Sequence, residues 1–352
     1  SENEPPIPPF LLQTRSDIHN KFGDLEWQQR VRIAAGHNPP SPASPDSQPS
    51  PWSRLDPTSN AEILRRNRYQ NVEPWAANRV RLLVPEGVSD YINASPIILT
   101  QTVSGIEKRF IATQGPKEGT ESHIWRMVYA ETGKEDEKAV IVMLTQTHEQ
   151  GREKCFQYFP ADMVNPVFAV NEQDEFADGF TGTLTLKSIA EDQETRSTVR
   201  EIDLETCVSA ASATSMTHTE QPESTTSTTA KIHKPITHLL FGGWPDFLVP
   251  EGPDRAALLN LISLSAKLNS NPSNPRIVHC SAGVGRSGTF IALDFLLQEI
   301  AEGAWDDLSP FEARDPVLEC VDALRKQRMM MVQGEGQFAF LYDVCREAWV
   351  ER

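Results

Sequence analysis

One cysteine stands at the start of a glycine-rich loop whose composition suits an anion. In the stretch IVHCSAGVGRSGTF, Cys280 follows a short apolar run and precedes glycines, an arginine and hydroxyl side chains. The run RIVH is typical of a buried strand, and SGTFIALDFLLQEI has the apolar spacing of a helix. Glycines allow backbone N–H groups to approach a ligand, and a helix N-terminus attracts negative charge. The stretch therefore predicts a cradle for a phosphate group or a similar anion.

Two kinds of phosphate chemistry compete for this loop. In the pattern G-x-x-x-x-G-K-[ST] of nucleotide hydrolases, the defined positions correspond here to Cys280, Gly285, Arg286 and Ser287. A nucleotide hydrolase would need the lysine and a magnesium-holding carboxylate, whereas an arginine binds two phosphoryl oxygens with its planar fork. Helix N-termini and cationic neighbours favour the thiolate form of cysteine. The replacements therefore favour attack by Cys280 on phosphorus, with Arg286 and the loop amides holding the oxygens.

A phenolate leaving group would need a proton, and the stretch GGWPDF offers an acid. Asp246 lies between a proline and aromatic residues, where a general acid could protonate the departing oxygen. Trp244 and Pro245 would stiffen this loop, and Gly242 and Gly243 would serve as its hinges. WPDF alone is equally compatible with an ordinary turn, so the catalytic interpretation depends on the cysteine loop.

The elements that must position these residues alternate along the chain. Strand-like runs span residues 109–114, 139–146, 181–189, 197–204, 236–241 and 276–279, and helical patterns span residues 122–133, 254–268 and 287–300. Strands occur in adjacent groups as well as between helices, which predicts an α/β (α+β) domain with a mixed sheet covered by helices.

Composition divides the chain into segments. Residues 1–36 are expected to form a helical segment packed on the main domain, and residues 37–60 a proline- and serine-rich linker or loop. The main domain is expected to span residues 61–352, with a Ser/Thr-rich insertion at residues 205–231. Serines precede prolines in the linker, which suits a proline-directed kinase but is also ordinary linker composition. These serines are Ser41, Ser44 and Ser50.

Bulk properties narrow the possible partners. A net charge of −16 and a pI near 5.0 would repel nucleic acids and anionic membranes, so neither is an expected partner. No apolar run is long enough to span a bilayer, and the first residues lack the basic and apolar regions of a secretory signal. The five cysteines are widely spaced, which suits neither a disulfide framework nor a zinc site. We expect a cytoplasmic protein, with the nucleus as a second location.

The segment from His279 to Ser287 matches H-C-x-x-G-x-G-R-[ST], the signature of the protein tyrosine phosphatases. Further stretches resemble the landmarks of that family in the family's order: RNRYQNVEPW, DYINAS, FIATQGP, IVMLTQTHEQGREKCFQYFP, GWPDF and MVQGEGQFAF. The resemblance covers roughly residues 60–350 and points to the intracellular, non-receptor, phosphotyrosine-specific branch and to a fungal member. It implies one catalytic domain with a highly twisted mixed sheet. It also implies hydrolysis of phosphotyrosine in proteins through a cysteinyl-phosphate, without metal or cofactor.

The resemblance also assigns roles in the reaction. Asp246 would lie on a closing loop and act first as acid and then as base, Gln333 would position the water of the second step, and Ser287 would hydrogen-bond the thiolate. The remaining residues around the bound phosphate would be Ser281, Ala282, Gly283, Val284, Gly285 and Gln337.

Other residues would shape and support the pocket. By resemblance, Tyr69 would form its wall and make it too deep for phosphoserine. Asn71 takes a position where an aspartate often holds the backbone of the substrate peptide. Glu149 would orient Arg286, and Lys154 would lie near the acid loop.

His279 adjoins the nucleophile, but neighbouring residues on a strand point to opposite faces, so we do not expect it to be the general base. The resemblance gives it the organisation of the loop and the thiolate. Three positions depart from the family pattern: Leu248, Gly334 and Phe338 stand where glycine, threonine and tyrosine are common. They leave the rate of loop closure and the peptide preference open.

Two alternatives remain at this point. A catalytically silent phosphotyrosine-binding module would keep Arg286 but could lose Cys280 or Asp246, and both are present. A dual-specificity phosphatase is disfavoured by Tyr69 and by the DYINAS and FIATQGP landmarks. The expected partners are phosphotyrosine-containing proteins, with a MAP kinase as a candidate, and the expected state is monomeric.

Overall fold

A computed structural model describes residues 6–37, 49–56, 60–133, 137–208, 230–309, 311 and 313–352. Most of the expected linker, with Ser41 and Ser44, and the central part of the expected insertion lie outside the described residues. Across the described residues, no helix combines the length and apolar content that crossing a bilayer requires.

The core of the domain is an eight-stranded mixed sheet with the order β1-β2-β10-β3-β9-β8-β7-β6. The four neighbouring strands β2, β10, β3 and β9 run parallel, and the outer pairs are antiparallel. The bounds are β1 Ala94–Thr100, β2 Glu107–Thr113, β3 Ala139–Met143, β6 Val167–Val170, β7 Thr181–Asp192, β8 Ser197–Val208, β9 Ala230–Phe241 and β10 Arg276–His279. The predicted mixed sheet is confirmed.

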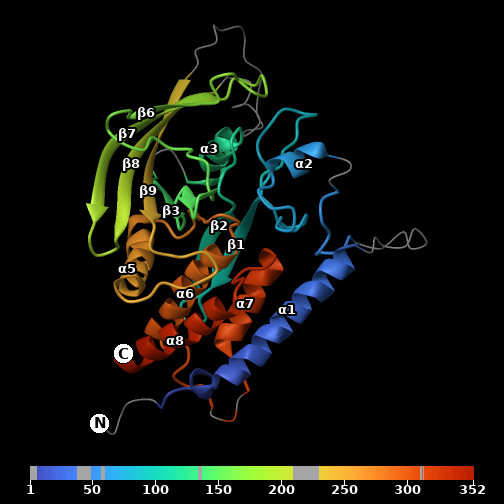
Figure 1. The fold of residues 1–352 in the computed structure, drawn as a ribbon, viewed down its shortest axis with the longest axis vertical. Coiled ribbons are helices and arrows are strands. Elements are labelled where there is room, and N and C mark those ends of the chain that lie inside the picture. Colours follow the sequence, from blue (N-terminus) through green and yellow to red (C-terminus); the bar gives the residue numbers. More distant parts are fainter. Residues whose placement is uncertain are drawn as a thin grey trace, which may run out of the picture.

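Helices cover both faces of the central strands (Figure 1). Along β3, Val140 and Val142 belong to the core beneath α5, α6, α7 and α8, and Ile141 and Met143 belong to the core beneath α3. Burial of both faces explains why AVIVM is apolar throughout. The bounds are η1 Pro9–Leu12, α1 Arg15–His37, α2 Ala61–Arg66, α3 Glu121–Glu131, α5 Pro253–Leu268, α6 Gly285–Ala301, α7 Pro316–Gln327 and α8 Glu335–Glu351, with a small hairpin of β4 His148–Glu149 and β5 Arg152–Glu153.

The N-terminal segment forms one long helix, α1, which runs along α7 and α8 (Figure 1). The ring of Phe22 lies 5.9 Å from that of Phe338, centroid to centroid. Arg325 of α7, whose side chain is fully buried, donates to Glu26 at 2.8 Å. The helix is thus anchored by an aromatic contact and a partly buried ion pair.

The expected insertion at residues 205–231 begins and ends differently in the structure. β8 and β9 pair continuously from Ser197 opposite Phe241 to Val208 opposite Ala230. Residues 205–208 and 230–231 are therefore strand, because each strand completes the hydrogen bonds of the other. The polar composition of the insertion begins inside the hairpin and does not mark the strand ends.

Candidate active site

A cavity of about 410 Å³ lies where the chain leaves β9 and β10. The predicted site residues that line it are Tyr69, Asn71, Lys154, Asp246, Cys280, Ser281, Ala282, Gly285, Arg286, Gln333 and Gln337. Three more, Glu149, Trp244 and Pro245, line a neighbouring cavity of about 390 Å³. The predicted residues that line neither cavity are Gly283, Val284, Ser287 and His279. Segments far apart in sequence thus meet at one opening.

Cys280 lies directly after β10, and α6 starts only five positions later, at Gly285. Its side chain is buried, and its Sγ accepts hydrogen bonds from the Gly283 N–H at 3.3 Å and from the Ser287 hydroxyl at 3.2 Å. Donors at these positions stabilise a negative charge on sulfur, and the positive end of the helix dipole adds to them. The arrangement suits a nucleophilic thiolate.

The shape of this loop depends on one glycine and one buried arginine. Gly283 has a φ of +76°, and a Cβ at that position would lie 2.2 Å from the carbonyl oxygen of Thr113. Arg328, at the end of α7, is fully buried and donates to the carbonyls of Gly283 at 2.9 Å and Ala282 at 3.0 Å. Burial lowers the pKa of Arg328 to about 10. Its role was missed because only the tertiary fold brings it beneath the loop.

Arg286 is poised to bind an anion in the cavity. Its side chain is 1% exposed, and its Nη1 donates to Glu149 at 2.7 Å and to the Trp244 carbonyl at 2.9 Å. Burial lowers the pKa of Arg286, but the negative charges of Cys280, Glu149 and Asp246 outweigh it and raise the pKa above its usual value. Among the described residues, its buried Nε and Nη2 have no hydrogen-bond partner. These groups can form the paired donors that a phosphoryl group accepts.

The predicted acid loop, residues 242–248, leads from β9 into the cavity. Trp244 is buried and its indole N–H donates to the carbonyl of Leu248 at 2.9 Å, which closes the loop on itself. Asp246 accepts a hydrogen bond from Lys154 at 2.7 Å, and its other oxygen lies 3.3 Å from Nη2 of Arg286. Phe247, with a φ of +59°, and Leu248 are about 60% exposed. Leu248, which stands where glycine is common, serves the loop through its backbone carbonyl, and its side chain lies largely in solvent.

Two glutamines reach the nucleophile loop from the segment before α8 and from its first turn. A Cβ on Gly285 would lie 3.3 Å from Oε1 of Gln333 and 3.2 Å from Oε1 of Gln337. Gln337 also accepts from the Gly334 N–H at 3.1 Å and lies 3.5 Å from the carbonyl of Leu248. Both amides therefore lie beside the predicted phosphate cradle, and Gln337 also adjoins the predicted acid loop.

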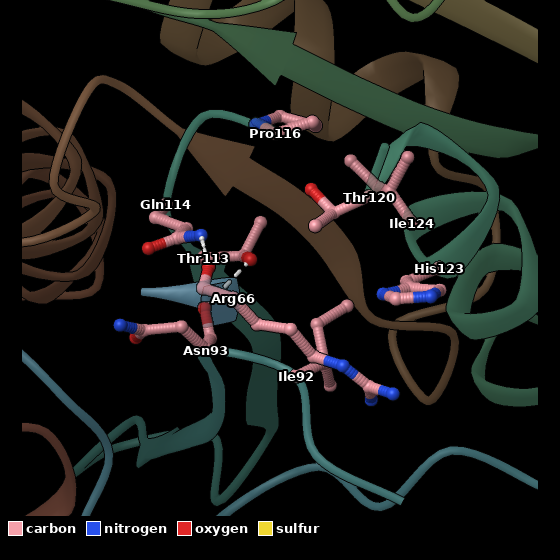
Figure 2. Close-up of a pocket in the computed structure, with 9 residues that line it drawn as sticks. All are labelled: Arg66, Ile92, Asn93, Thr113, Gln114, Pro116, Thr120, His123 and Ile124. Carbon is pink, nitrogen blue, oxygen red and sulfur yellow. Dashed lines mark hydrogen bonds between the residues drawn. The ribbon is translucent and has the colours of Figure 1, made fainter. Parts of the chain in front are cut away.

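Tyr69 stands at the wall of the cavity, with its hydroxyl 2.8 Å from that of Ser281. The preceding segment is held by Gln114, which donates to the Arg66 carbonyl at 2.7 Å (Figure 2). Gln114 also accepts from the Arg68 N–H at 2.9 Å. Beside these contacts is a cavity of only about 20 Å³, close to the space that one water occupies. The wall is therefore fixed by a residue at the end of β2.

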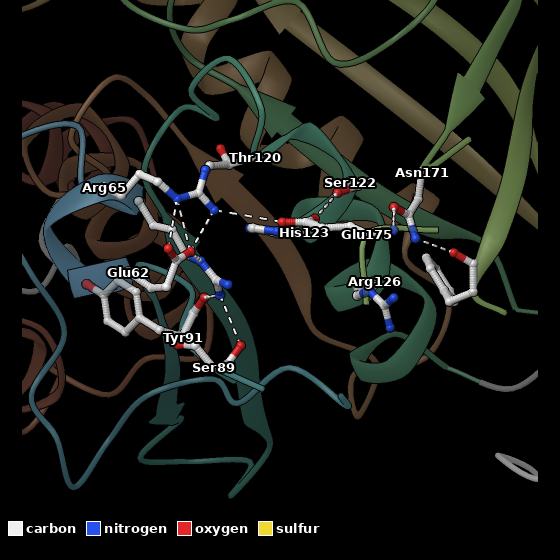
Figure 3. A network of polar contacts seen from close by, with 12 residues as sticks. Glu62, Arg65, Ser89, Tyr91, Thr120, Ser122, His123, Arg126, Asn171 and Glu175 are labelled. Atoms are coloured by element: carbon white, nitrogen blue, oxygen red, sulfur yellow. Dashed lines mark hydrogen bonds and ion pairs between the residues drawn. The ribbon is translucent and has the colours of Figure 1, made fainter. Parts of the chain in front are cut away.

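A polar network holds α2, the helix before Tyr69 (Figure 3). Arg66 donates to the carbonyl of Tyr91 at 2.6 Å, and Arg65 pairs with Glu62 at 2.6 Å. Glu175 lies 3.7 Å from Arg65 and accepts from His123 of α3 at 2.9 Å. The loop before β7 thus connects α3 with α2. The sequence carries no signal of this network, because its members are scattered over more than a hundred positions.

His279 points away from the cavity into a buried chain of hydrogen bonds. Its Nδ1 donates to the carbonyl of Cys280 at 3.2 Å, and its Nε2 lies 2.7 Å from the hydroxyl of Tyr158. That hydroxyl also lies 2.9 Å from Nε2 of His238 in β9. Burial lowers the pKa of His279 to about 4 and that of His238 well below its usual value. Neutral His279 therefore accepts from Tyr158, which accepts from His238.

Comparison with known proteins agrees with this geometry. The family model described as protein-tyrosine phosphatase matches residues 63–347. Tyrosine-protein phosphatase 2 of Schizosaccharomyces pombe is 34% identical over 340 residues, 97% of this chain but only 40% of that protein. Tyrosine-protein phosphatase 1 of Saccharomyces cerevisiae is 32% identical over 348 residues, 96% of each chain.

A solved structure of PTPN18 in complex with HER2 phosphopeptides gives a TM-score of 0.65 at 25% identity. The match covers 94% of this chain and 99% of that one. The helices and the mixed sheet are thus shared over nearly the whole length. The chain belongs to the protein-tyrosine phosphatase family, as its landmarks predicted.

Proposed function

We propose that this protein hydrolyses phosphotyrosine in proteins through a cysteinyl-phosphate intermediate, with Asp246 as general acid and then base. One observation carries the proposal: the Cys280 sulfur, the guanidinium of Arg286, whose Nε and Nη2 lack a hydrogen-bond partner among the described residues, and the carboxyl group of Asp246 meet at one cavity. The family membership supports the same reaction, and the phosphopeptide-bound PTPN18 structure supports the same class of substrate.

In the first step, the Cys280 thiolate attacks phosphorus and the bond from phosphorus to the phenolic oxygen breaks. The departing oxygen takes the proton of Asp246, so that tyrosine leaves neutral. Backbone N–H groups at the start of α6 and the guanidinium of Arg286 hold the other phosphoryl oxygens as charge moves onto them. Their burial strengthens these interactions because little water competes.

In the second step, water attacks the cysteinyl-phosphate and gives its proton to the Asp246 carboxylate. The sulfur–phosphorus bond breaks, which releases phosphate and restores the thiolate. Gln333, beside Gly285, is placed to orient this water, and the Ser287 hydroxyl donates to the leaving sulfur. The same carboxyl group thus serves in both directions.

Substrate choice follows from the depth of the cavity. Cys280 is buried at its floor, and Tyr69 stands at its wall with Asn71 nearby. The ring of phosphotyrosine spans this depth and stacks on Tyr69, whereas the short side chain of phosphoserine does not bring its phosphate to the sulfur. Proteins that carry phosphotyrosine are the resulting substrates, and a MAP kinase among them stays a prediction.

The test compares a phosphotyrosine peptide with its phosphoserine counterpart in the presence of a metal chelator. We expect the purified chain to release phosphate from the phosphotyrosine peptide alone, and Cys280→Ser to lose turnover but keep binding the peptide. Equal rates on both peptides would refute the specificity. Turnover retained by Cys280→Ser would remove Cys280 from the nucleophile's role.

A further inference from the structure

Arg152 is an exposed cation at the rim of the active-site cavity. Within the described part of the chain, its guanidinium has no hydrogen bond or ion pair. The other charged groups of the rim are engaged. Lys154 pairs with Asp246 at 2.7 Å, and Glu153 pairs with Arg68 at 3.2 Å.

The geometry of the small hairpin turns Arg152 toward the site. Gln150 and Gly151 both have positive φ, at 50° and 73°, and Glu149 pairs directly with Arg152. Cross-strand partners project from the same face of a hairpin. On that face Glu149 reaches Arg286 at 2.7 Å, whereas Glu153 projects to the other side and reaches Arg68. Arg152 therefore shares the face that serves the catalytic arginine.

Arg152 also lies between two hollows. It lines the 410 Å³ cavity that holds Cys280 and the 390 Å³ cavity between the hairpin and the acid loop. Asp246 and Phe247 of the acid loop line both cavities as well. A peptide whose phosphotyrosine enters the first cavity would carry its neighbouring side chains past this point, because residues of an extended chain are about 3.3–3.6 Å apart.

We propose that Arg152 selects substrates that carry an anionic side chain within two residues of the phosphotyrosine. This inference rests on the proposed phosphatase activity and adds a substrate class to it. The planar guanidinium binds a carboxylate or a second phosphate with two parallel hydrogen bonds. Elsewhere the net charge of −16 repels acidic peptides, so a local unpaired cation gives them a place to bind.

The test uses phosphotyrosine peptides that differ at one flanking position. Alanine, glutamate or phosphothreonine is placed up to two residues before or after the phosphotyrosine. We expect wild type to favour one glutamate or phosphothreonine peptide over its alanine counterpart in kcat/KM by about two- to fivefold, the range of an exposed ion pair. Preference for glutamate alone would identify a carboxylate ligand, and a larger preference for phosphothreonine would identify a phosphate.

Arg152→Gln should reduce this ratio to about one, and Arg30→Gln is the matched control. Arg30 is an exposed arginine of α1, so its replacement makes the same charge change away from the cavity. A ratio that survives Arg152→Gln, or falls equally in Arg30→Gln, would overturn the inference.

Peptide affinities in a Cys280→Ser background separate this inference from the proposed activity. They should show the same ratio and the same loss on Arg152→Gln without any turnover. Wild type that fails to hydrolyse even phenyl phosphate, which has no flanking residue, would refute the activity. Equal affinities for neutral and anionic peptides would refute the selection by Arg152 and leave the proposed activity standing.

Discussion

Cys280 and Asp246 reach the same cavity from loops that leave neighbouring regions of the sheet, but the two loops are held differently. Residues 279–287 are almost entirely buried and are anchored from below by Arg328. The acid loop buries Trp244 but leaves its tip at Phe247 exposed. A nucleophile needs one fixed geometry, whereas an acid that closes over a substrate needs a tip with few buried contacts.

The strands from which the two loops start are nevertheless linked by hydrogen bonds. β9 and β10 lie on either side of β3, and the hydroxyl of Tyr158 contacts His238 of β9 and His279 of β10. The two loops therefore differ only in the residues that extend beyond the ends of β9 and β10. A change of Asp246 near the exposed tip of the acid loop should alter the chemistry and leave binding intact, whereas a change of the backbone in residues 279–287 should distort the site.

After the loss of turnover expected for Cys280→Ser, the largest effect is expected at Asp246 in the acid loop. Asp246→Ala removes the acid that protonates the leaving tyrosine, so kcat should fall by about 10²- to 10⁴-fold. Phosphopeptide affinity should persist because Cys280 and Arg286 still form the cradle. Steady-state kinetics and peptide binding check both expectations.

Leu248→Ala is the control in the same loop, since its side chain is 62% exposed and only its carbonyl serves Trp244. We expect a much smaller change in kcat. If both variants lose activity equally, the loss reflects the shape of the loop and the acid role of Asp246 is refuted.

The difference between the buried cysteine loop at the floor of the cavity and the acid loop also explains which site residues the sequence could predict. The residues at the floor of the cavity are close together in sequence. Cys280, Arg286 and Ser287 lie within one strand-loop-helix unit, so their spacing indicates a common site. The predicted strands were likewise found because β3 is a short continuous apolar run and β10 carries a buried Ile-Val pair. Asp246 can be predicted as a general acid only together with the cysteine loop, since WPDF alone is equally compatible with an ordinary turn.

The remaining contacts depend on distant segments. Arg328 supports the loop from 45 positions beyond Gly283, and Tyr158 joins histidines 80 and 121 positions away. A lone arginine or tyrosine in a sequence carries no sign that the fold will bury it. Arg152 was equally hidden, because a run of charges in HEQGREK is typical of a solvated turn until the register of its hairpin is known.

At the floor, Gly283→Ala should cost about 10²-fold in kcat/KM, the loss expected when a reacting group moves by about an ångström. The new Cβ would lie 2.2 Å from the Thr113 carbonyl oxygen, and a φ of +76° is strained for alanine. Gly23→Ala in α1 meets nothing within 4 Å. It should leave activity unchanged and stabilise the fold by about 0.5–1 kcal/mol. Near-normal activity of Gly283→Ala would show that the floor is not rigid.

The smallest effect concerns the link between β9 and β10 through Tyr158, and it appears as a dependence of the free energy of unfolding on pH. His238 is fully buried and burial holds its pKa well below the ordinary value of 6.5, so the folded protein leaves it neutral while the unfolded chain protonates it. Stability from this histidine is complete above pH 6.5 and is lost as the pH falls below it. Between pH 7 and pH 5 the loss is about 2 kcal/mol. His238→Gln cannot titrate, so its free energy of unfolding should fall by about that much less over this range.

Denaturant unfolding at both pH values measures this difference, and Tyr158→Phe separates it from the loss of hydrogen bonds. That variant removes the hydroxyl between the histidines and should be less stable at pH 7 and at pH 5 alike. Its pH slope should match wild type, because burial is the main cause of the low His238 pKa and burial persists without the hydroxyl. If His238→Gln instead kept the wild-type slope, the pKa of His238 would be the same in the folded and unfolded protein, and burial would not hold the folded imidazole neutral at pH 5.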